Sequence, residues 1–158
     1  MHFVNSYNIN TFQVFNCFIQ KYGVDIDNKY PLLDKMSFDV INPTIAVKIF
    51  NNPLIDVTFY QETPYACDTK TLVVVDNDVL STQFAEEEKY ALIAHEIGHL
   101  HCSLCGCNCC GFVGETHADD FACSLGLQSE LRSALTKLLG VVLDPNLKSE
   151  IVQRINRL

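Results

Sequence analysis

The segment Ala91–Cys110, ALIAHEIGHLHCSLCGCNCC, places two histidines four residues apart and then has five cysteines within nine residues. A helix has about 3.6 residues per turn, so His95 and His99 lie on one face and their rings can reach a single ion. Glu96, next to His95, can hold a water molecule bound to that ion. This HExxH pattern predicts a zinc site on a helix, and zinc needs a third protein ligand.

A second helical segment offers that ligand. The sequence ETHADDFA begins with Glu115, has Asp119 one turn later, and carries Ala118 and Ala122 alongside. Small alanines let two helices approach closely, as they must if a carboxylate on one is to reach a metal on the other. We assign Glu115 as the third ligand. We expect Asp119 to accept a hydrogen bond from the non-coordinating nitrogen of a zinc histidine.

Each of these residues also has an ordinary explanation. HExxH can occur by chance on a helix, Glu115 can be a helix-start acid, and Asp119 can be a surface residue. The presence of the second half-motif on a separate helix favours the metal site. His101 and His117 each lie two residues from a proposed ligand, which turns them to the far face of their helices, and neither is assigned a catalytic role.

The flanking sequence predicts mixed secondary structure. Apolar spacing predicts a helix over Ile9–Tyr22, ending near Gly23, and Asn42 could begin a short second helix through Asn51, although TIAVKIF would also serve as a strand. The β-branched runs Leu54–Tyr60 and Thr71–Asp76 predict strands. Four further helices are expected at about 81–100, 115–126, 128–139 and 147–158. This order of elements predicts an α+β fold with a small mixed sheet.

Two of these stretches together resemble a known family. LVVVDNDVLSTQFAEEEKYALIAHEIGHL, residues 72–100, followed by ETHADDFA, resembles the gluzincin metallopeptidases of the HtpX and CAAX-prenyl-endopeptidase family. The closing segment LDPNLKSEIVQRINRL is more faintly similar. The resemblance implies a zincin-like domain with an HExxH helix and an ExxxD helix, zinc on His95, His99 and Glu115, Glu96 as general base, and Asp119 supporting the ligands.

The same residues also resemble the ImmA/IrrE proteases, which cleave repressors, and the motifs do not separate the two families. Two features depart from the HtpX type. Those proteins are generally embedded in membranes, whereas this chain has no apolar run of the roughly 18 residues that a span needs. The interval between His99 and Glu115 is also short, which leaves little room for an elaborate substrate pocket.

These observations lead us to expect a zinc metalloendopeptidase acting on a peptide or protein substrate. Glu96 would take a proton from a metal-activated water and pass it to the leaving amine. One alternative is a zincin-like binding or regulatory protein that keeps the metal without cutting. Others are an enzyme held latent by its C-terminal segment or cysteine loop, and a repressor-cleaving protease of the ImmA/IrrE type.

The cysteine cluster suggests a second, structural zinc ion. Four of its cysteines have the pattern CxxCxCxxC, with His101 and Cys109 as substitutes: Cys102, Cys105, Cys107 and Cys110. Zinc ribbons usually separate their two pairs by about 12 or more residues, whereas one residue separates them here. A redox-sensitive or adventitious metal-binding loop, or simple packing residues, therefore stay open as explanations.

The length, composition and net charge of the chain limit the class of protein and the partners that it can have. A length of 158 residues with 48% hydrophobic residues predicts one globular domain over residues 1–158. The formal charge of −8 argues against a nucleic-acid partner. The first residues lack the charged and apolar regions of a secretory signal, so we expect a soluble, cytoplasmic protein with reduced thiols.

Overall fold

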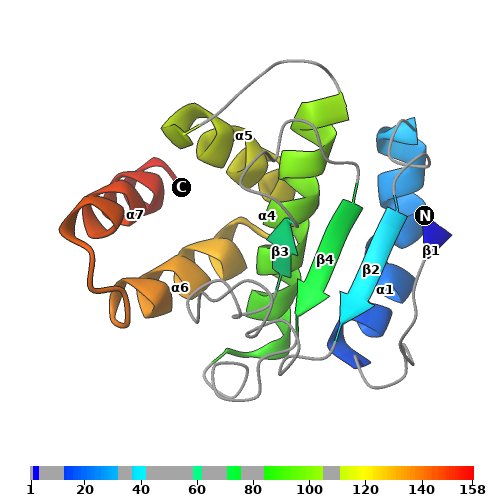
Figure 1. The fold of residues 1–158 in the computed structure, drawn as a ribbon, viewed down its shortest axis with the longest axis horizontal. Coiled ribbons are helices and arrows are strands. Elements are labelled where there is room, and N and C mark those ends of the chain that lie inside the picture. Colours follow the sequence, from blue (N-terminus) through cyan, green and yellow to red (C-terminus); the bar gives the residue numbers. More distant parts are fainter. Residues whose placement is uncertain are drawn as a thin grey trace.

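The computed structural model describes residues 2–3, 13–31, 37–41, 59–61, 71–75, 84–104 and 111–158 (Figure 1). Side chains are described for residues 17–31, 84–99, 101–102 and 111–158. The elements in chain order are β1 (His2–Phe3), α1 (Gln13–Lys29), β2 (Ser37–Ile41), β3 (Phe59–Gln61), β4 (Thr71–Val75), α4 (Glu86–Leu104), α5 (Gly111–Ser124), α6 (Gln128–Leu139) and α7 (Pro145–Arg157).

The strands pair through their backbones in the order β1-β2-β4-β3. Strand β2 is parallel to both β1 and β4, with Ser37 opposite Thr71, and β3 is antiparallel to β4, with Phe59 opposite Val74. In Figure 1 helix α4 passes behind β3 and β4, with α1 on one side and α5 and α6 on the other.

The expected α+β, zincin-like class is wrong for the part of the chain whose side chains are described. That part forms five helices and no strand, and it is all-α. Its buried core residues lie in helices or in the short connections beside them. Runs of β-branched residues predict extended backbone, but they do not show whether a sheet supplies a face of the core. Contacts between helices supply the described core.

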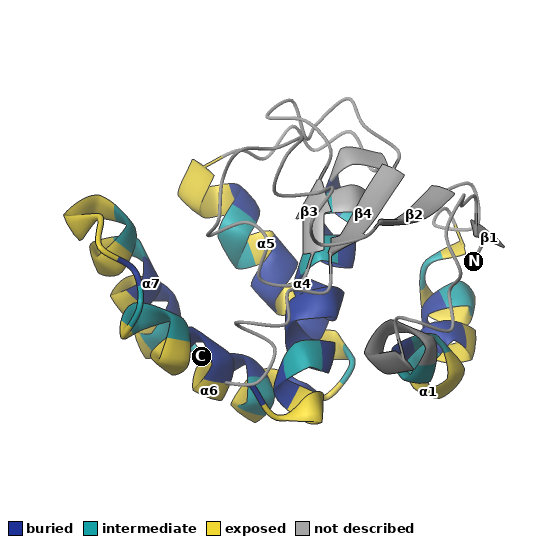
Figure 2. Ribbon diagram, turned by 60° about the horizontal axis from the view of Figure 1, so that its bottom comes forward, coloured by how far each residue is buried: buried dark blue, intermediate teal, exposed yellow. Residues whose placement is uncertain are grey.

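Helix α4 is the centre of that core. It contacts α1, α5 and α6, and it is buried along most of its length, whereas α6 and α7 expose their outer faces (Figure 2). Ala91, Ile93, Ala94 and Ile97 are each fully buried, so apolar residues point in several directions around this helix. A helix that is apolar on several sides must be enclosed by other elements. The HExxH residues therefore lie on a helix that is largely enclosed by other elements.

Helices α4 and α5 approach each other closely at Gly98. A Cβ atom added there would lie 2.8 Å from the Cα of Ala118, 2.8 Å from the Cβ of Phe121 and 2.9 Å from the Ala118 carbonyl oxygen. Ala118 and Ala122 are fully buried in the same contact. The absence of a side chain on Gly98 therefore lets the two helices pack backbone against backbone, which the alanines alone would not allow.

Several helices begin or end at other residues than the sequence predicts. Helix α1 begins at Gln13 and continues through Gly23 to Lys29, because Phe18, Tyr22 and Ile26 extend its apolar stripe past the glycine. Helix α5 begins at Gly111, four residues before Glu115.

The prediction for α6 is confirmed over Gln128–Leu139, and α7 begins at Pro145, after Asp144 accepts a hydrogen bond from the Asn146 amide. The predictions over residues 42–51 and 54–58, at Asp76 and at the capping residues 81–82 fall outside the described residues.

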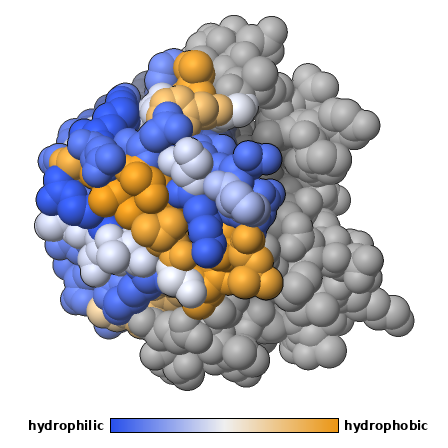
Figure 3. Space-filling model, turned by 90° about the vertical axis from the view of Figure 1, so that its left-hand side faces the viewer, coloured by the Kyte–Doolittle hydropathy of each residue, from blue (hydrophilic) through white to orange (hydrophobic). Residues whose placement is uncertain are grey.

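The surface over the end of the molecule that carries α6 and α7 is mostly hydrophilic, with hydrophobic areas between the polar ones (Figure 3). The exposed large hydrophobic residues among those described are Val24, Phe112, Val113, Leu143 and Val152. None of the described helices combines the length and the apolar character that crossing a membrane requires.

Replacing Gly98 with alanine should force α4 and α5 apart. Overpacking of this kind costs about 1–3 kcal/mol of unfolding free energy, which denaturant unfolding of the metal-free protein measures. Gly140→Ala is the matched control, because its added Cβ meets only the Lys137 carbonyl oxygen, at 3.3 Å. Equal stability of the Gly98→Ala protein and the wild type would show that the close approach is not required.

Candidate metal centre

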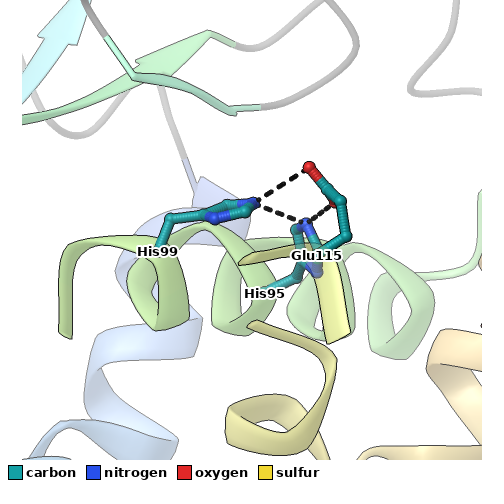
Figure 4. Close-up of side chains that lie close together, drawn as sticks. All are labelled: His95, His99 and Glu115. Atoms are coloured by element: carbon teal, nitrogen blue, oxygen red, sulfur yellow. Dashed lines mark hydrogen bonds and ion pairs between the residues drawn. The ribbon is translucent and has the colours of Figure 1, made fainter. Parts of the chain in front are cut away.

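The described structure brings together two histidines of α4 and one glutamate of α5 (Figure 4). His95 and His99 lie one helical turn apart, and their Nε2 atoms are 3.1 Å from each other. The two carboxylate oxygens of Glu115 lie 3.0 Å from His95 Nε2 and 3.4 Å from His99 Nε2. His95 is buried, and the other two side chains are partly buried.

This spacing fits a single small cation. Two ligand atoms about 2.0–2.1 Å from a tetrahedral zinc ion are about 3.3 Å apart. The three distances that the structure gives, 3.0, 3.1 and 3.4 Å, are close to that value. Imidazole nitrogens and a carboxylate are also donors that zinc accepts. The His95, His99 and Glu115 group could therefore hold a metal ion.

Asp119 fixes how His95 presents its ring. One oxygen of this fully buried carboxylate lies 2.8 Å from His95 Nδ1. A carboxylate can only accept, so Nδ1 donates, and the Nε2 lone pair is left for a metal once Nε2 loses its proton. One turn of α5 separates Asp119 from Glu115, so the same helix supplies both carboxylates.

Arg154 of α7 is a site residue that the sequence reasoning missed. Its Nε and Nη2 atoms each donate to a different oxygen of Asp119, both at 2.8 Å, and Nη1 lies 3.2 Å from Glu115. The arginine is only 6% exposed. A signal was present in the sequence, because Arg154 interrupts an otherwise apolar stripe, with helical spacing, that includes Ile151 and Leu158. A charged residue at such a position needs a buried partner.

The pKa values of the site reflect these ion pairs. Burial alone lowers the pKa of His95, but the carboxylates of Glu115 and Asp119 outweigh burial and raise it to about 10. Burial raises the pKa of Asp119, yet the hydrogen bonds from Arg154 and His95 bring it below its ordinary value. Burial also raises the pKa of Glu115, but the two neighbouring histidines outweigh burial and lower this pKa below its ordinary value. Both carboxylates are therefore charged at neutral pH.

Glu96 lies at the edge of the group. Its Oε1 is 3.9 Å from His95 Nε2, and its side chain is 25% exposed. Burial raises its pKa above the ordinary value, although the neighbouring His95 and His99 act in the opposite direction. A carboxylate with a raised pKa accepts a proton more readily than an ordinary glutamate does.

The predicted cysteine site is only partly within the described residues. Cys105, Cys107 and Cys110 lie outside them, so the proposed four-thiolate zinc site is not placed. Cys102 is described and buried, and its sulfur lies near His117 of α5. His101 and His117 are not part of the His95, His99 and Glu115 group.

No family model, curated protein or solved structure matches this chain. We therefore infer the function from the geometry of the site.

Replacing Arg154 with methionine should leave the buried Asp119 carboxylate without its strongest partner. Breaking a buried ion pair costs about 3–5 kcal/mol, so the free energy of unfolding should fall by that order in denaturant titrations. Arg157→Met is the matched control on the same helix. Arg157 pairs with Asp120 at the surface, where such pairs contribute about 0–1 kcal/mol. Similar losses in both variants would contradict the role given to Arg154.

Zinc binding to His95 should release a proton. The pKa of His95 is raised to about 10, so its ring is protonated at neutral pH and a metal competes with the Nε2 proton. Affinity should therefore rise about tenfold per pH unit between pH 6 and 8. Calorimetry in buffers of different ionisation enthalpies measures the protons released by the binding event that His95→Ala removes. A pH-independent affinity for that event would contradict the assignment.

Proposed function

We propose that this chain is a zinc-dependent metallopeptidase that hydrolyses peptide bonds in a peptide or protein substrate. The observation that carries the proposal is the number and spacing of the donors. The described residues supply three ligand atoms, from His95, His99 and Glu115, whereas structural zinc sites usually have four protein ligands. Three ligands leave a coordination position for water, as in catalytic zinc sites.

A zinc ion at these donors would supply Lewis acidity, polarising a substrate carbonyl and lowering the pKa of a bound water from about 16 toward about 7. Glu96 is the residue that takes the proton from water. It follows His95 in the chain, lies at the rim of the donor group and is partly exposed, so it can exchange a proton with substrate. Glu96 then delivers that proton to the leaving amine.

Asp119 and Arg154 keep the donors in place. Asp119 holds the His95 ring through Nδ1, and Arg154 holds both Asp119 and Glu115. The C-terminal helix therefore contributes a buried residue to the site. This contact speaks against a C-terminal segment that acts only as a removable inhibitor, because its removal would also remove Arg154, one of the two partners of Asp119.

Glu96→Gln is the sharpest test of the proposal. The variant should still bind zinc, because the amide replaces a group that is not a ligand, and should lose about 100-fold or more of the hydrolysis of fluorescently labelled casein. Glu87→Gln, an exposed change in the first turn of the same helix, should retain full activity.

Two outcomes contradict the proposal. Full hydrolysis by Glu96→Gln would exclude Glu96 as the base. Stoichiometric zinc binding by the wild type without any hydrolysis would instead favour a metal-binding regulatory protein.

A further inference from the structure

A second pair of metal-ligating side chains, Cys102 and His117, lies between the same two helices. A hollow of about 260 Å³ is lined by residues of α4 and α5, including His101, Cys102, His117 and Asp120. None of the first donor group lines it. His101 and His117 are each two residues from a donor of the first group, which is about 200° around a helix. The hollow is therefore on the other side of the α4–α5 contact from His95.

Cys102 and His117, which both line the hollow, have the spacing of two ligands on one ion. Cys102 Sγ lies 3.7 Å from His117 Nδ1, and the two residues come from different helices. With zinc–sulfur and zinc–nitrogen bonds of about 2.3 and 2.0–2.1 Å, two tetrahedral ligands are about 3.6 Å apart. The observed separation is that of a thiol–imidazole hydrogen bond and is also close to this value.

Two further donor side chains, His101 and Asp120, line the hollow, although neither stands close enough to Cys102 and His117 to form a group of three ligand atoms. His101 is partly buried and lines the hollow. Its ring packs edge-on against Tyr30, with ring centroids 4.6 Å apart, so its orientation is restrained. Asp120 accepts two hydrogen bonds from Arg157 and still lines the hollow with its partly exposed carboxylate.

We propose that a second divalent ion of the zinc class binds in this hollow, held by the Cys102 thiolate and the His117 imidazole. His101, Asp120 or water completes the coordination. Binding transfers the Cys102 thiol proton to solvent. The ion would link the C-terminal part of α4 to α5 on one side of their contact, while the first ion links them on the other. This proposal does not depend on the proposed peptidase activity.

Cobalt(II) distinguishes the two sites because only a thiolate ligand produces an intense sulfur-to-cobalt charge-transfer band in the near ultraviolet. The double variant His95→Ala/His99→Ala removes the first site. It should still bind one cobalt ion per chain and show this band. In that background, Cys102→Ser should abolish the band, and His117→Gln should weaken cobalt binding at least about tenfold. Cys123→Ser, a cysteine of α5 that does not line the hollow, is the control.

Two results would overturn the proposal. One is the absence of a second bound ion. The other is an unchanged band and affinity in Cys102→Ser or His117→Gln, which would mean that other cysteines hold the ion. If the Cys102→Ser protein does not fold, as judged by its helical circular dichroism, the exposed His117 carries the test, because its replacement does not disturb the core.

Discussion

The close approach of α4 and α5 at Gly98 is the constraint on which the site depends. A side chain at this position would come within 2.8 Å of the facing helix. With glycine there, Glu115 reaches two histidines on the neighbouring helix, although a carboxylate side chain is short. Small residues at a helix contact usually serve packing alone. In this protein they also bring side-chain atoms from two helices to a spacing that could hold one metal ion.

A second constraint comes from burying charge. Asp119 has no exposed surface, and a buried carboxylate is costly unless it is paired and hydrogen-bonded. Arg154 donates hydrogen bonds to both Asp119 oxygens, and His95 donates to one of them. The cost of burying the carboxylate is therefore offset only when α4, α5 and α7 are all in place. The ion pairs therefore connect the order of the metal site to the docking of the C-terminal helix. Replacing the network with apolar residues would remove this connection even if stability were kept.

The amount that could be predicted from sequence differed from one part of the protein to another. His95 and His99 share a face because of helix periodicity, and Glu115 and Asp119 follow from the same rule on the next helix. These are local properties, so a single sequence is enough to predict them. The role of Arg154 depends on how α7 packs against α5, which the sequence does not show directly. Its place in an apolar stripe was the available signal.

The errors at the level of the fold have a similar origin. Helix α1 was predicted to end near Gly23 because glycine often ends helices, but packing of Ile26 extends it. The α+β class was inferred from β-branched runs, whereas the described core is made by helices whose mutual contacts are tertiary. Local propensity predicts an element more reliably than it predicts which elements bury one another.

The most direct test of this account is the coordination of zinc in the metal-loaded protein, determined by crystallography. We expect an ion bound by the Nε2 atoms of His95 and His99 and by Glu115, with a solvent ligand in the remaining position. A structure in which Glu115 stays paired with Arg154 and does not bind the ion, or in which zinc is held only by cysteines, would contradict it.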